Sequence, residues 1–240
     1  MRRFLGAVQF LTLLPIARST ASPGEAAPFF PLIGALIGAA AGAVLRIARI
    51  ALGQSIAALV AILFLIAITG GLHEDGLADV ADAFRAGRTR DKIMLILKDS
   101  RIGSYGALAL IVSITIRWQA LANSKANIVL GLAAALALSR TSLVIVAAIS
   151  PPAGEGLGLA FARSLSRKIA MIAGAEGTII ALACGWRIGA AMALASLAVT
   201  FLARAYFVRR LGGVNGDCLG ATCQIVETVN LLLLAWRPSI

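Results

Sequence analysis

The sequence predicts an all-α polytopic integral membrane protein that forms a single membrane domain over residues 1–240. Hydrophobic residues make up 60% of the chain and the mean hydropathy is +0.92, whereas an ordinary soluble domain is roughly 45–50% apolar. The apolar residues also form long uninterrupted runs instead of the spaced stripes of amphipathic helices. Such runs are typical of helices that lie in lipid, so the bilayer is an expected partner.

Several apolar runs approach the length of a transmembrane helix, which is about 20 residues. Within the first run, Gly34, Gly38 and Gly42 recur every four residues and give a small-residue face on which helices can approach closely. We therefore expect about seven transmembrane helices. The runs cover residues 29–50, 55–72, 105–122, 127–149, 169–186, 188–207 and 218–236.

The N-terminal segment differs from these runs because its apolar stretch is too short to span a bilayer. Arg2 and Arg3 precede it, which is also the pattern of a cleavable signal peptide. Pro15 and Arg18 fit such a signal poorly. We favour a short N-terminal helix that is interfacial or re-entrant, with the signal peptide as the alternative.

Basic residues exceed acidic ones, giving a formal net charge of +11. In a soluble protein this excess would suggest nucleic acid, but membrane proteins gather basic residues in their cytoplasmic loops. The densest basic cluster lies between the second and third runs. We therefore expect residues 73–104 to form a cytoplasmic loop of a bacterial inner-membrane protein, with its active site facing the cytoplasm and no nucleic-acid partner.

Most acidic residues lie in the same loop. On an α-helix, Asp79 and Asp82 would point about 40° and about 20° away from Asp75, so the three carboxylates share one face. Like charges on one face destabilise a helix, and Mg²⁺, which prefers carboxylate oxygens, would remove that conflict. One ion cannot touch all three, because they span roughly 10 Å of helix axis. The alternative is a solvated acidic face.

A Cys/His zinc site is not expected. The chain has one histidine, and Cys184, Cys218 and Cys223 lack C-x-x-C spacing. The cysteines should pack as small hydrophobes. Any catalytic metal is therefore expected to have oxygen ligands.

A second motif lies directly before the third run, at residues 98–106. Basic side chains, hydroxyls and glycines at the start of a helix suit an oxyanion, because free backbone N–H groups point at it. The alternative is a basic anchor at the membrane edge. The candidate residues of this motif are Lys98, Asp99, Ser100, Arg101 and Gly103.

A third motif, at residues 209–217, opens the last apolar run. Asp217 can reach a site shared with the other two motifs, whereas Glu227 should lie inside the membrane, where an ionisable group suggests function. Arg140 is its expected charge partner, and polar packing between helices is the alternative. The candidate substrate-binding residues here are Arg140, Arg210, Gly213, Asn215 and Glu227.

The runs at 70–82, 98–103 and 212–217 closely resemble the motifs of the cobalamin synthase family, the adenosylcobinamide-GDP ribazoletransferases. The segment at 9–15 resembles the family's N-terminal segment, and the likeness covers nearly the whole chain. It implies an inner-membrane enzyme of late cobalamin biosynthesis that joins adenosylcobinamide-GDP to α-ribazole, or to its 5′-phosphate, and releases GMP with Mg²⁺ as cofactor. The matching positions are Asp75, Asp79, Asp82, Asp99, Arg101 and Asp217, while Glu74 and Gln224 correspond to positions at which the family varies.

Roles for these residues follow from phosphoryl transfer, in which cations neutralise charge on the transferred group. Lys98 and Arg101 would bind the diphosphate oxygens, Asp99 would join them in catalysis, and Asp82 would accept the proton of the ribazole hydroxyl. A homo-oligomer, or association with other corrinoid-assembly enzymes, stays open. The expected metal ligands are Glu74, Asp75, Asp79, Asp82 and Asp217.

Two alternative functions follow from the same features. A CDP-alcohol phosphotransferase also places spaced aspartates at a membrane helix end, but its D-x-x-D-G-x-x-A-R pattern is absent at residues 75–83. A secondary transporter would use Glu227 and Arg140 as coupling residues inside the membrane. The sequence shows no convincing internal repeat, which disfavours the transporter.

Overall fold

The computed structural model describes residues 1–16, 19–124, 127–154 and 156–236. Within these ranges the regular elements are helices, and the single β-type contact is a bridge between Pro152 and Val214. The helices are α1 (Arg2–Leu11), α2 (Pro23–Ala26), η1 (Ala27–Phe29), α3 (Phe30–Thr69), α4 (Leu72–Ala86), α5 (Arg90–Leu97), α6 (Ser104–Asn123), α7 (Ile128–Ile149), α8 (Leu157–Ser164), α9 (Arg167–Ala183), α10 (Trp186–Leu211) and α11 (Gly216–Ala235). The all-helical class is confirmed.

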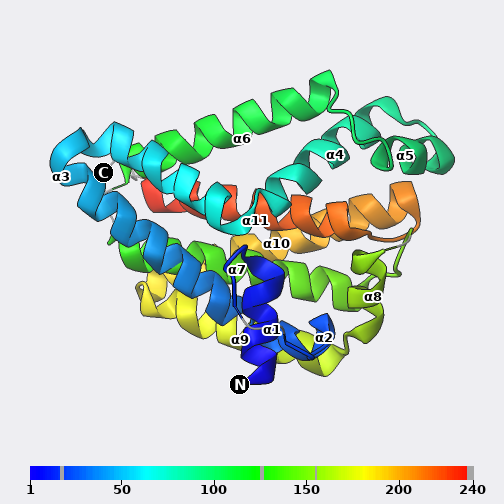
Figure 1. The fold of residues 1–240 in the computed structure, drawn as a ribbon, viewed down its shortest axis with the longest axis horizontal. Coiled ribbons are helices and arrows are strands. Elements are labelled where there is room, and N and C mark those ends of the chain that lie inside the picture. The colour runs from blue at the N-terminus through cyan, green and yellow to red at the C-terminus, as the bar shows by residue number, and fades with distance from the viewer. Residues whose placement is uncertain (17–18, 125–126, 155, 237–240) are drawn as a thin grey trace.

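Five helical segments of the described chain are long and apolar enough to cross a membrane: Pro23–Thr69, α6, α7, α10 and α11. The chain is thus a multi-pass membrane protein, but the expected count of about seven is not confirmed. The runs at 29–50 and 55–72 both fall in α3, which bends at Gly53, where φ is 73° and ψ 169°. Figure 1 shows the two arms of α3 diverging from this bend. The run at 169–186 becomes α9, a shorter helix of 17 residues.

The core is built around α7, which is buried along most of its length and packs against α3, α9, α10 and α11 (Figure 1). The predicted small-residue face is confirmed on α3. A Cβ added at Gly34 or Gly38 would overlap the backbone of α7, so only glycine permits this approach. Cys218 and Cys223 are buried in the core as predicted, and Cys184 is partly exposed.

The segment expected to be a cytoplasmic loop is largely helical, since it contains α4 and α5. Gly70 and Gly71 both have left-handed backbone conformations, with φ of 68° and 69°, and make the turn from α3 to α4. This turn directs α4 along α6 and α11. At the crossing of α4 and α11, the Cα atom of Gly76 lies 3.5 Å from the position of a Cβ on Gly220. The two helices therefore approach closely enough to share a site.

The short helix expected at the N-terminus is present as α1, whose Ala7 and Leu11 are buried. The segment after it is tied to the end of α3, because the Leu13 N–H donates to the Ile68 carbonyl over 2.8 Å. The Gln9 side chain accepts the Ser19 N–H over 2.8 Å. These bonds place the N-terminal segment beside the turn between α3 and α4.

Candidate active site

A polar cavity of about 640 Å³ lies where the N-terminal segment, the α3–α4 turn, α4 and the start of α6 meet. Gly70 and Gly71 belong to its lining, and because glycine has no Cβ, a ligand can approach their backbone closely. Ser100 and Ile102 of the second motif form another part of the lining. Its polar side chains belong to Gln9, Thr12, Thr69, Asp75, Asp79 and Ser100. Segments distant in sequence thus converge on one cavity.

Four carboxylates gather beside this cavity. Burial, together with the charges of Asp75, Asp217 and Asp82, raises the pKa of Asp79 to about 6. The expected shared face on α4 is therefore real, and α11 adds Asp217 to it. Between described residues, none of these four carboxylates forms an ion pair. The cluster therefore carries negative charge that no ion pair among the described residues balances.

The donor set fits a hard divalent cation, because it consists of carboxylate oxygens with excess negative charge. In the described part of the chain, no three His, Cys, Asp or Glu side chains converge into a closed metal cage. This agrees with the helix geometry, in which one ion cannot touch all three aspartates of α4. Mg²⁺ usually takes one or two protein carboxylates and completes its shell with water and substrate phosphates.

Asp217 is held at the first turn of α11 by the third motif. The Asn215 side chain caps the helix by accepting the Cys218 N–H over 3.0 Å, and its amide donates to Asp217 over 2.7 Å. Gly76 makes room for this arrangement, since a Cβ there would come within 2.9 Å of the Asp217 carbonyl oxygen. Asn215, expected to bind substrate, thus has a positioning role.

Asp82 joins α4 to the start of α6. Its carboxylate accepts the Gly103 N–H over 2.7 Å, and a Cβ at Gly103 or Gly106 would overlap it. Asp82 is not among the described residues that line the polar cavity. Asp82 and Gly103 thus contact each other outside the described lining of the polar cavity, and the general-base role of Asp82 stays a prediction.

The second motif forms an exposed loop. The Arg101 guanidinium donates to the Asp99 carboxylate, Nη2 to Oδ2 at 2.7 Å and Nε to Oδ1 at 3.0 Å, and the Arg101 backbone N–H donates to Oδ1 at 3.1 Å. The bonds from Arg101 lower the pKa of Asp99 to about 2. The Arg101 side chain is 86% exposed, and Lys98 caps the end of α5. Only Ser100 of the predicted polar residues in this loop lines the cavity.

Arg210 lies at the other end of α4, away from the carboxylates. Its guanidinium donates to the carbonyls of Phe84 and Gly87 over 3.1 and 2.8 Å, where α4 ends, and it stacks over the rings of Phe84 and Tyr206. Gly213 packs against the Pro151 carbonyl. The expectation that Arg210 and Gly213 bind substrate is not supported, because each serves a protein contact.

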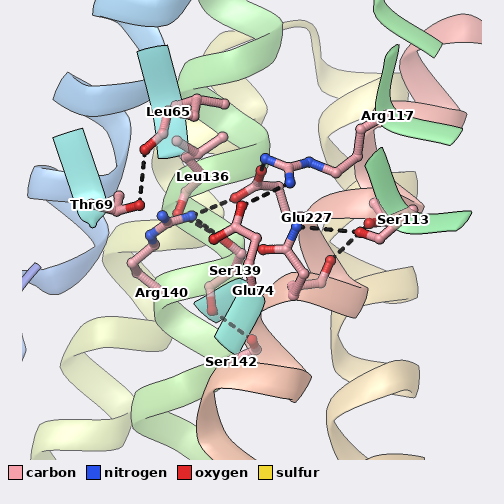
Figure 2. Close-up of polar contacts among 12 residues, drawn as sticks. Leu65, Thr69, Glu74, Ser113, Arg117, Leu136, Ser139, Arg140, Ser142 and Glu227 are labelled. Carbon is pink, nitrogen blue, oxygen red and sulfur yellow. Dashed lines mark hydrogen bonds and ion pairs between the residues drawn. The ribbon is translucent and has the colours of Figure 1, made fainter. Parts of the chain in front are cut away.

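A buried charge network lies beside the acidic cluster, and we define it as Glu74, Arg117, Arg140 and Glu227. Figure 2 shows the Glu227 carboxylate between the two guanidinium groups. Glu227 accepts from Arg117 and from Arg140 at 2.7 Å each, and Arg117 also donates to Glu74 at 2.9 Å. The expected Arg140–Glu227 pair is confirmed. Two arginines and two glutamates give the network no net charge.

Three members of this network had been expected to bind metal or substrate. Glu74 was expected to bind metal, but its carboxylate pairs with Arg117 because it lies about 100° around α4 from Asp75. Arg140 and Glu227 were expected to bind substrate, and neither is among the described residues that line the polar cavity. Arg117, which is 1% exposed, had no predicted site role. The sequence feature that could have revealed its role is a charged side chain within an apolar run.

His73 packs next to the buried network. Burial lowers its pKa to about 3, and the charge of Arg140 acts in the same direction. Its Nε2 atom is buried without a hydrogen-bond partner in the described structure. The imidazole is therefore neutral near pH 7.

A second cavity, of about 300 Å³, adjoins the polar one. The two share Gln9, Phe10, Leu72 and Asp75. The rest of its lining is mostly apolar and comes from α4, α7, α8 and α11: His73, Leu143, Gly158, Phe161, Gly216, Asp217, Leu219 and Gly220. Asp75 and Asp217 thus stand at the edge of an apolar space. Fold and side chains together define a multi-pass helical membrane protein with an acidic cluster beside two adjoining cavities.

Comparison with known proteins assigns the family. The model of the cobalamin-5-phosphate synthase family matches residues 3–235. An adenosylcobinamide-GDP ribazoletransferase of Bradyrhizobium diazoefficiens is 42% identical over 95% of this chain and 91% of its own length. That of Ralstonia pickettii is 37% identical over 97% and 95%, and that of Escherichia coli 34% over 96% and 98%. No solved structure matches. The chain belongs to the cobalamin-5-phosphate synthase family.

Proposed function

We propose that this chain joins adenosylcobinamide-GDP to α-ribazole, or to α-ribazole 5′-phosphate, and releases GMP. The relatives that this chain matches over nearly their whole length are named for this reaction. The observation that carries the proposal is a cluster of four carboxylates, two of which, Asp75 and Asp79, line a polar cavity. Family membership favours this transferase over the lipid phosphotransferase and the transporter.

The transfer is a displacement at phosphorus. A ribose hydroxyl oxygen of α-ribazole forms a bond to the phosphorus on the cobinamide side of the diphosphate. The bond from that phosphorus to the bridging oxygen breaks, and GMP leaves with the electron pair. The hydroxyl proton passes to a carboxylate, and Asp79 is the better candidate than Asp82 because it lines the cavity.

The chain's own residues would bind and orient the diphosphate in the polar cavity. Gly70 and Gly71 let it approach the backbone, and Ser100 offers a hydroxyl. Lys98 and Arg101, on the same loop as Ser100, would bind its outer oxygens. Asp75, with Asp217 from α11, would hold Mg²⁺, which when bound supplies positive charge against the charge of the diphosphate.

We also propose that the protein lies in the bacterial inner membrane with this site on the cytoplasmic side. The arginines and lysines of residues 85–101 support that orientation. The two arms of α3 and the helix α9 would then bring the number of spans to seven. The Arg85 guanidinium lies over the Tyr105 ring at 5.7 Å, an arrangement that suits a membrane edge.

The test is an assay of the purified protein with adenosylcobinamide-GDP and α-ribazole, in which cobalamin and GMP are both measured with Mg²⁺ and with a chelator. We expect equal amounts of both products, formed only with the metal. Asp75→Asn should lower kcat by roughly 10²-fold or more, because it removes charge stabilisation at the reacting phosphate.

Asp91→Asn is the matched control for Asp75→Asn. Asp91 lies in the exposed first turn of α5, outside both cavities, and its loss should leave kcat unchanged. Full activity of Asp75→Asn would contradict the proposed site. A wild-type protein that forms neither product would contradict the proposed function.

A further inference from the structure

The apolar cavity has an aromatic wall and carboxylates at its edge. Phe10 and Phe161 line the wall, and Phe30, which is fully buried, packs behind them. The rings of Phe30 and Phe161 are stacked with centroids 5.5 Å apart and planes 4° apart. Phe10 stacks on both, at 5.2 Å from Phe30 and 5.5 Å from Phe161. The wall is therefore an aromatic surface backed by a third ring.

The edge of the cavity is acidic. Asp75 lines both cavities, and Asp217 lines the apolar one. A ligand that filled the apolar space would thus have its polar end at the carboxylates. At about 300 Å³ the cavity lies at the small end of the range for ligand sites. It fits a flat aromatic group joined to a hydroxylated one.

We propose that this cavity binds the aromatic base of the nucleoside co-substrate, with its ribose at Asp75 and Asp217. The proposal rests on the proposed function, in which α-ribazole supplies a dimethylbenzimidazole base on a ribose. The base has an apolar body, and one of its two ring nitrogens is already bonded to the sugar. The other substrate places its diphosphate in the polar cavity, so the attacking hydroxyl and the phosphorus meet at Asp75.

Guanine, the other planar base in the reaction, suits this cavity less well. Its edge carries several hydrogen-bond donors and acceptors, and burying them against leucine and phenylalanine side chains is unfavourable. Dimethylbenzimidazole carries two methyl groups in their place. The lining around Phe161, Leu143 and Leu219 therefore favours the base of α-ribazole.

The first test compares Phe161→Leu with Phe4→Leu in the product assay. Phe161→Leu keeps an apolar side chain but removes the ring, and we expect the KM for α-ribazole to rise about 3- to 10-fold. The KM for adenosylcobinamide-GDP and kcat should not change. Phe4 lies on α1, the helix of Phe10, and its ring meets Phe29 at 6.1 Å outside the cavity lining. Phe4→Leu should change neither KM.

The second test uses the wild-type protein and free dimethylbenzimidazole as the probe, so it holds even if Phe161→Leu does not fold. The free base should inhibit competitively against α-ribazole and not against adenosylcobinamide-GDP. Two results would overturn the proposal: inhibition by the free base that is competitive against adenosylcobinamide-GDP, or a Phe161→Leu variant in which only the KM for adenosylcobinamide-GDP changes. Either result would mean that guanine or the corrinoid occupies the cavity. If the wild-type protein forms product, the proposed function holds whichever substrate the free base competes with. If it forms no product, both the proposed function and the proposed base site fail.

Discussion

The acidic cluster and the buried charge network lie next to each other on α4 but treat charge in opposite ways. Asp75, Asp79, Asp82 and Asp217 repel one another beside a cavity, and none of them forms an ion pair with another described residue. In the network, by contrast, Glu74 and Glu227 are matched by two arginines at 2.7–2.9 Å. Adjacent residues of one helix, Glu74 and Asp75, belong to different regions.

The difference indicates that the acidic cluster serves the reaction and that the buried network serves the packing of the helices. Uncompensated carboxylates are poor for stability but leave negative charge available for a cation and its phosphate ligand. A balanced, buried network links α4, α6, α7 and α11 without net charge. We infer that the network sets the position of α4 and that the acidic cluster uses this position.

The largest effect should come from breaking the balance of the network. Glu227→Gln leaves two arginines against one glutamate, and an unpaired buried charge destabilises a protein by about 3–5 kcal/mol. We expect little folded protein, measured as the recovery of a monodisperse peak in detergent and as the apparent Tm.

The control for this prediction restores neutrality. Glu227→Gln combined with Arg140→Gln leaves the Arg117–Glu74 pair and should recover much of the lost stability. Equal stability of the single and double variants would show that charge balance is not the function of the network.

A smaller effect is expected where α4 crosses α11, since this contact sets Asp75 relative to Asp217. A Cβ at Gly76 would come within 2.9 Å of the Asp217 carbonyl, whereas one at Gly220 would meet only ordinary contacts at 3.4–3.5 Å. Gly76→Ala should therefore destabilise by about 1–3 kcal/mol and lower kcat, as measured by thermal unfolding and by product formation.

Gly220→Ala is the matched substitution on the facing helix. It should be neutral, or stabilise by up to about 1 kcal/mol, because alanine favours a helix over glycine. If both variants behaved alike, the close approach at Gly76 would not be what positions the two aspartates.

Much of the fold and part of the site follow from local sequence patterns. Apolar runs predict the membrane helices because burial in lipid demands about 20 apolar residues in succession. The helical period places Asp75, Asp79 and Asp82 on one face. The pairing of Arg140 with Glu227 follows from the cost of leaving either charge alone in the membrane.

Other features depend on contacts between distant segments. Whether two apolar runs form separate helices or one bent helix turns on the backbone at Gly53. Glu74 pairs with Arg117 on α6, 43 residues away, and Arg210 caps α4 from α10, more than 120 residues away. Spacing within one motif contains no information about these partners, so the sequence did not predict the contacts of Glu74 and Arg210.

The smallest expected effect concerns Asp79 of the acidic cluster and the dependence of stability on pH. The pKa of Asp79 is about 6 in the folded chain and 3.8 in the reference state. Between these values the folded protein binds more protons than the unfolded one, so stability falls as pH rises through this window. Without metal, Asp79→Asn should therefore stabilise the protein at pH 8 by about 1 kcal/mol, once solvent screening is allowed for, and have no such effect near pH 4.

The measurement is the apparent Tm of both proteins in chelator across this pH range, with Asp91→Asn as the exposed control. Asp91 lies in the first turn of α5, where a negative charge favours the helix, so its removal should not stabilise. The same Asp79→Asn protein should lose activity, because the carboxylate that repels its neighbours also faces the cavity. A loss of stability at pH 8 would mean that Asp79 holds the fold together, and the distinction between the acidic cluster and the buried network would fail at that residue.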